Sequence, residues 1–121
     1  MDDFASLFAA DAHFVNVVGV WWKDRNEIKA AHAATHQTMF KDSRLSGEVS
    51  SRREVAPGVI AVHVTWILTG AIAPDGSPAG DREGILLLIL TNEQSGWRIK
   101  LAQNTDILRG AIAPPARGDK S

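Results

Sequence analysis

The sequence predicts an α+β fold, with helices packed on one face of a strongly curved, mainly antiparallel sheet. Two observations lead to this prediction: helical periodicity is confined to the N-terminal part, and strand-like segments joined by short turns follow it. This order of elements is typical of α+β proteins. A chain of 121 residues is the size of one domain. We expect residues 1–109 to form that domain and residues 110–121 to be a disordered tail.

The N-terminal part contains two helical patterns with a strand pattern between them. The spacing of phenylalanine and leucine predicts a short helix over residues 3–10. Residues 12–18 are rich in β-branched and aromatic side chains, which predicts a strand, and Gly19 marks a turn or bulge after it. Asp24 or Asn26 can cap the long helix that follows. We expect this helix to end between Phe40 and Asp42.

Four strand-like segments make up the rest of the sheet. Residues 43–55 are mostly polar and alternate weakly, as expected of a strand near an edge. Residues 59–69 and 97–107 alternate cleanly, and residues 70–80 form the clearest hairpin connection. Residues 82–92 are apolar on both faces. A strand of this kind is covered on both sides, so we expect helices on one side and a second subunit on the other.

Composition excludes several classes of function. Thirteen basic and fourteen acidic residues leave a net charge of -1, so no strong positive field attracts nucleic acid. Cysteine is absent, which rules out disulfides and zinc sites built on sulfur. The longest apolar run, residues 85–90, is too short to cross a bilayer, and the N-terminus is acidic where a secretory signal is basic. We therefore expect a cytoplasmic protein that binds neither nucleic acid nor membranes.

Two histidines lie on the inward-facing stripe of the long helix. His32 and His36 are four residues apart and so share one helical face. The spacing suits a metal-binding pair, but Ala33 stands where a zinc protease has glutamate, and His13 and His63 fall on outward strand faces. We expect no metal and no cofactor. The pair therefore serves either as general acid or base in an apolar pocket, or as core histidines bonded to neighbouring groups.

Amides and aromatic rings provide the other candidate ligand-binding residues. Asn16 and Gln103 are in register with apolar neighbours, and a buried amide needs a hydrogen-bond partner. Asn104 and Asp106 fall on the opposite face, unless a bulge adds one residue to the last strand and exchanges them with Gln103. Asp106 is a candidate either to orient a histidine or to cap the strand end. The remaining expected lining residues are Trp21 or Trp22, Met39, Phe40 and Trp66.

Together these segments resemble the nuclear transport factor two-like superfamily, and more narrowly the SgcJ/EcaC group of SnoaL-like proteins. The resemblance covers residues 3–108. It is carried by residues 8–12, residues 14–22, Arg25, Ile28, His32, His36, residues 62–64, Trp66, residues 97–99 and residues 103–106. It implies the cone-shaped, cystatin-like fold that SnoaL-like polyketide cyclases, ketosteroid isomerase and scytalone dehydratase share. This fold hosts many unrelated chemistries and also plain binding domains.

Two hypotheses about function follow. The first, implied by the resemblance, is a small-molecule pocket protein with isomerase-, cyclase- or dehydratase-like acid/base chemistry on a small, apolar, oxygenated or polyketide-like compound. In it, His32 or His36 exchanges a proton, and Asn16 or Gln103 steadies an oxyanion. The second is a non-catalytic ligand-binding or dimerisation module. In both we expect a homodimer formed through the outer sheet face around His63.

Overall fold

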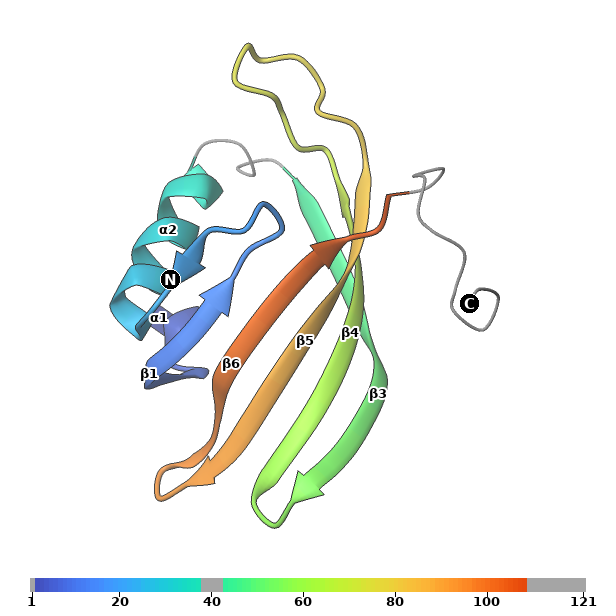
Figure 1. Cartoon of the computed structure of the whole chain (residues 1–121). Coiled ribbons are helices and arrows are strands. Elements are labelled where there is room, and N and C mark those ends of the chain that lie inside the picture. Colours follow the sequence, from blue (N-terminus) through green and yellow to red (C-terminus); the bar gives the residue numbers. More distant parts are fainter. Residues whose placement is uncertain (1, 38–42, 109–121) are drawn as a thin grey trace.

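The computed structural model describes residues 2–37 and 43–108, which form one curved sheet with two short helices (Figure 1). Six strands lie in the order β2-β1-β6-β5-β4-β3. All neighbours are antiparallel except β1 and β6, which are parallel. The elements are α1 (Asp2–Ala5), β1 (Phe8–Val15), β2 (Trp21–Trp22), α2 (Arg25–Gln37), β3 (Arg44–Ala56), β4 (Val59–Thr69), β5 (Arg82–Glu93) and β6 (Gly96–Asp106).

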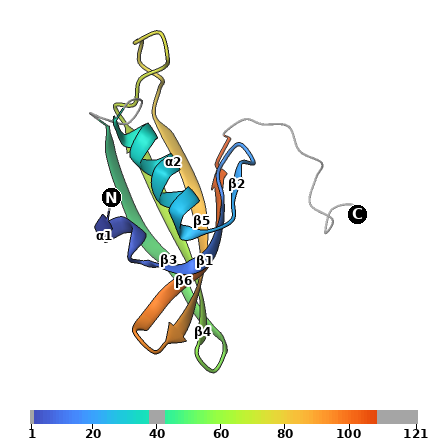
Figure 2. The same cartoon turned by 90° about the vertical axis from the view of Figure 1, so that its left-hand side faces the viewer.

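Both helices lie on the same face of the sheet, which confirms the predicted α+β architecture (Figures 1 and 2). The main core lies between α2 and the β1–β6 part of the sheet. Ile28 of α2 is fully buried, and Phe8 of β1 is 2% exposed. The other buried members of this core are Ala9, Ala12, Phe14, Ile99 and Ala102. Hydrophobic burial at this contact holds α2 against the sheet.

Two hydrogen bonds from backbone N–H groups to side chains form where α2 begins, after β2. The Glu27 backbone N–H donates to the Asp24 carboxylate at 2.8 Å, and the Lys23 backbone N–H donates to the Glu27 carboxylate at 3.0 Å. Asp24 is thus the N-cap of α2 and satisfies one of the backbone donors that the helix leaves unpaired, while Glu27 satisfies the N–H of Lys23, the residue before the cap. Of the two caps that the sequence left open, Asp24 or Asn26, the structure shows Asp24.

The expected helix over residues 3–10 is wrong, because α1 ends at Ala5 and β1 already begins at Phe8. Phe8 pairs with Ile99 of β6, and the Ile99 N–H donates to the Leu7 carbonyl at 2.8 Å. Two helical turns are marginal in isolation, so pairing with a central strand overrides the helical spacing.

The strand expected over residues 12–18 also ends earlier, at Val15. The Asn16 Oδ1 atom accepts hydrogen bonds from the backbone N–H groups of Val18 at 3.1 Å and Val20 at 2.8 Å. Gly19 has a φ of 85°, which a glycine adopts without strain. The chain therefore turns at Asn16, and the short strand β2 pairs back onto β1.

A bulge in β6 decides which side chains of this strand face the helices. Leu101 pairs with Ile89 of β5, but the next pair joins Ile99 to Leu90, so Lys100 has no partner on β5. The bulge shifts alternation by one residue. The expected inward position of Gln103 is therefore wrong: it pairs with Leu87 on the outer face, and Asn104 and Asp106 face the helices instead.

Candidate functional site

His32 belongs to α2 and lies among aromatic rings between this helix and the sheet. Its ring centroid is 4.8 Å from that of Phe4, 5.1 Å from that of Phe14 and 5.2 Å from that of Trp22. Its Nδ1 atom is 2.8 Å from the Ile28 carbonyl oxygen, to which it can only donate. Of the two roles that the sequence left open for His32, these contacts support that of a core histidine bonded to the backbone.

Burial lowers the pKa of the His32 imidazole below its ordinary value of 6.5, while the hydrogen bond to Ile28 acts in the opposite direction. The unfolded chain therefore binds this proton more readily than the folded protein. We expect the free energy of unfolding to fall as the pH decreases below about 6.5, down to the lower pKa of the folded state. Denaturant unfolding at a series of pH values measures this slope.

The matched variant for this prediction is His32→Phe, which keeps an aromatic ring among Phe4, Phe14 and Trp22 but does not titrate. Its stability should depend less on pH than that of the wild type over the same range. Equal slopes for the two proteins would show that His32 does not carry the effect.

For the candidates near the end of α2, the structure describes no side chain. The backbone of His36 belongs to the last turn of α2, but its side chain is not described. Met39 and Phe40 lie outside the described residues altogether. Their expected contacts with a ligand remain predictions.

Trp66 packs among apolar side chains on the inner face of the sheet. Its indole is 8% exposed and packs with Leu68, Ala71 and the half-buried Val17 of the β1–β2 turn. Gly84, the residue opposite it on β5, leaves the space in which the indole lies. The Trp66 Nε1–H donates to Asn104 Oδ1 at 2.7 Å. The bulge in β6 therefore brings a tryptophan and an amide together on the inner face of the sheet.

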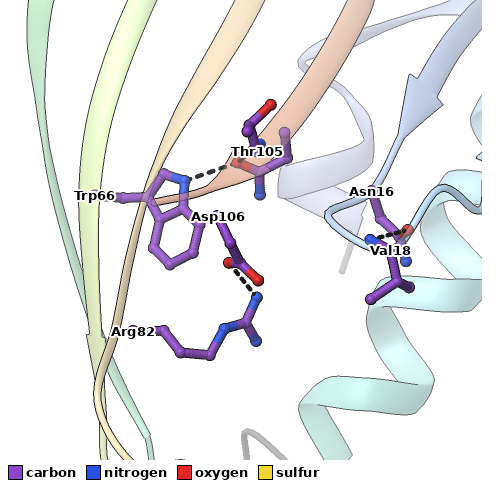
Figure 3. A network of polar contacts seen from close by, with 7 residues as sticks. Asn16, Val18, Trp66, Arg82, Thr105 and Asp106 are labelled. Atoms are coloured by element: carbon purple, nitrogen blue, oxygen red, sulfur yellow. Dashed lines mark hydrogen bonds and ion pairs between the residues drawn. The ribbon is translucent and has the colours of Figure 1, made fainter. Parts of the chain in front are cut away.

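An ion pair lies next to the Trp66 indole. Arg82 Nη2 is 2.7 Å from Asp106 Oδ1, and the two side chains are 30% and 26% exposed. The guanidinium carbon of Arg82 is 5.6 Å from the centroid of the Trp66 ring. Figure 3 shows the guanidinium and carboxylate pointing toward one another beside this ring. Asp106 thus pairs with Arg82; of the two roles that the sequence left open for it, orienting a histidine is not seen among the described residues.

A hollow of about 470 Å³ adjoins the ion pair, where β5 begins and β6 ends. This volume is in the range of small-molecule sites. Its lining residues are Asp81, Arg82, Glu83, Asp106, Ile107 and Leu108. We define the polar cluster as Trp66, Arg82, Asn104 and Asp106. Together with the hollow, it is the candidate site.

The other sequence candidates lie apart from the polar cluster. Trp22 faces α2, where its ring centroid is 5.2 Å from that of His32, whereas Trp21 is 53% exposed on the outer face. Asn16 uses its carbonyl oxygen to hold the β1–β2 turn. Sequence reasoning missed Arg82, because its partner Asp106 is 24 residues away and only the β5–β6 register joins them.

Among the described residues, no three His, Asp or Glu side chains gather as metal ligands usually do. None of the helices in that part of the chain has the length and hydropathy needed to span a membrane.

A strongly curved α+β sheet with both helices on one face defines a class, the proteins of cystatin-like fold. An uncharacterised protein of cystatin-like fold from Caulobacter vibrioides is 31% identical, with a TM-score of 0.79 over 98% of this chain and 80% of that one. The chain belongs to the family of this Caulobacter protein. No protein-family model and no curated protein matches the present chain.

Two further solved structures share the fold. A domain of unknown function with a cystatin-like fold from Nostoc punctiforme is 28% identical, with a TM-score of 0.76; the match covers 88% of this chain and 65% of that one. A ketosteroid isomerase-like protein from Erwinia carotovora atroseptica has a TM-score of 0.71 at 10% identity, covering 86% of this chain and 78% of that one. At this low identity, the likeness to the Erwinia protein concerns the fold alone.

Proposed function

We propose that this protein, as a member of the SgcJ/EcaC group of SnoaL-like proteins, binds a small, largely apolar, oxygenated ring compound at the polar cluster. The observation that carries the proposal is the half-buried amide of Asn104. The Trp66 indole is only a donor, so Asn104 must turn its Oδ1 atom toward it. Within the described residues, no acceptor contacts Asn104 Nδ2. A polar group in such a place needs a partner, which a ligand carbonyl or hydroxyl supplies.

The surroundings of Asn104 support a neutral ligand with an apolar body. The Trp66 ring and Leu86, which packs against it, offer apolar contact. The positive charge of Arg82 is already balanced by Asp106, so the pair does not call for a charged ligand. A polyketide-like ring with one or two oxygens matches this combination.

The bicyclic ketone β-tetralone is a suitable probe, and tetralin, the same ring system without the oxygen, is its control. We expect β-tetralone to bind about tenfold more tightly, the effect of roughly one hydrogen bond, and to shift the NMR signals of the Trp66 indole and the Asn104 amide. In Asn104→Leu the difference between the two compounds should disappear. Equal affinities for the wild-type protein, or shifts elsewhere, would refute the proposed site.

One observation favours acid/base chemistry as a second candidate function. The bulge places a carboxylate, Asp106, beside the amide donor of Asn104, and this combination is able to take a proton next to a carbonyl and to stabilise the resulting oxyanion. The same β-tetralone samples in D₂O test it. Faster deuterium exchange at the carbon beside the carbonyl, lost in Asp106→Asn while binding persists, supports catalysis. Binding without faster exchange would support the binding function and contradict catalysis.

We further propose that the protein forms a homodimer through the outer sheet face, which we define as the face opposite α2. Several large apolar side chains of this face are exposed: Trp21 53%, Ile67 53%, Leu101 48% and Ile85 39%. Exposed apolar patches of this kind usually mark interaction surfaces. A second copy of the same face buries them and accounts for the apolar outer side of β5.

A further inference from the structure

Trp21 and His13 are joined on the outer face. The Trp21 Nε1–H donates to His13 Nδ1 at 3.0 Å, and the two ring centroids are 5.5 Å apart. They line a shallow hollow of about 260 Å³ together with Val15, Leu87, Ile89, Leu101, Ala102 and Gln103. The bond holds the exposed indole of the edge strand β2 beside the centre of the sheet.

This hydrogen bond is compatible with only one protonation state of His13. An indole nitrogen has no acceptor lone pair, so His13 Nδ1 must be the unprotonated nitrogen of a neutral ring. Protonation would place an N–H at Nδ1 that faces the N–H of Trp21. The two donors would then oppose one another, and the bond would be lost.

The charged groups around the pair have opposite effects on a protonated His13. The Lys23 ammonium lies over the Trp21 ring, 4.6 Å from its centroid, so a charged His13 would place a second cation beside that ring. Asp11, on the same strand as His13, attracts such a cation, but it is paired with Lys100 of β6 at 2.8 Å. The side chains that β5 contributes to the hollow are Leu87 and Ile89, which offer no charge.

We propose that His13 is a proton-sensitive clamp for Trp21, and that its protonation releases the indole and weakens self-association through the outer face. The inference rests on the homodimer in the proposed function. Trp21 is among the most exposed large side chains of that face, so its position determines the shape that a second copy meets. A cation within an apolar interface also opposes association, because it loses its hydration there.

His63 offers an internal control on the same face. Its Nδ1 atom is 2.8 Å from Ser51 Oγ, and a hydroxyl either donates or accepts. The bond therefore survives protonation of His63. The charged residues nearest to it along the outer side of β3 are Glu48 and Arg53, of opposite sign, and β5 contributes Leu87.

The experiment follows the Trp21 indole signal by ¹⁵N NMR, assigned with Trp21→Phe, and the dimer by sedimentation velocity, from about pH 8 to about pH 5. We expect the Trp21 signal to shift and the dimer dissociation constant to rise by about tenfold or more over this range. His13→Gln keeps an acceptor that takes no proton, so both readouts should become independent of pH. His63→Gln should behave like the wild type.

The outcomes separate this inference from the proposed function. A dimer that is equally stable across the range, or a Trp21 signal that does not move, overturns the clamp and leaves the homodimer standing. A monomer at about pH 8 overturns the homodimer, and with it the control of self-association. A pH response that persists in His13→Gln but is lost in His63→Gln would show that His63, and not His13, carries the effect. This result would also overturn the clamp.

Discussion

Replacing Phe8 with alanine is expected to lower the free energy of unfolding by about 3–5 kcal/mol. The Phe8 side chain is 2% exposed, and its ring centroid is 5.1 Å from that of Phe4 and 6.0 Å from that of Phe14. Truncation leaves a cavity between α1, α2 and β1, which the packed backbone of β1 and β6 is unable to close. Denaturant unfolding followed by tryptophan fluorescence measures the loss.

The adjacent Leu7 is the control, since its side chain is 54% exposed. Leu7→Ala keeps the backbone carbonyl that accepts from Ile99 and should change stability by about 0.5 kcal/mol or less. A comparable loss in both variants would contradict the position of Phe8 in β1, because the two side chains would then be buried alike.

Gly84→Ala should be the second strongly destabilising change, by about 1–3 kcal/mol or more. A Cβ atom at this position would overlap the Cζ2 and Cε2 atoms of the Trp66 indole and would lie 2.6 Å from the Thr105 carbonyl oxygen. The ring must then move away from Asn104, or β5 must separate from β6. We therefore expect the Trp66 indole NMR signal to shift and β-tetralone binding to weaken together with stability.

Gly47 of β3 is the matched control, because it also pairs with Trp66, from the other side. A Cβ atom there would lie 3.2 Å from Val64 Cγ1 and 3.4 Å from the Thr65 carbonyl oxygen, contacts that small shifts relieve. Gly47→Ala should therefore cost less than Gly84→Ala. Adding Trp66→Leu to Gly84→Ala should recover part of the loss, but not all, because the contact with Thr105 is to backbone. Equal effects of the two glycine variants would show that Trp66 does not occupy the space above Gly84.

Several elements were predictable from the sequence because their signals are local. The clean alternation of residues 59–69 gave the bounds of β4, and Asp24 marked the start of α2 through its side chain. The inward stripe of the long helix also placed His32 against the core. In each case the deciding interactions lie within one strand or one helical turn, and periodicity or capping reveals them directly.

The candidate site depended on interactions between distant segments. Helical spacing at the N-terminus was overridden when Phe8 paired with Ile99. Alternation in the last strand suggested Gln103 as the inward amide, but the pairing with β5 places a bulge at Lys100 and turns Asn104 and Asp106 inward instead. The sequence thus determined the fold class and most of the strands, through patterns that each segment carries by itself. Only the tertiary structure decided which polar groups meet inside the sheet, because a shift of one residue in strand register reverses every side chain beyond it.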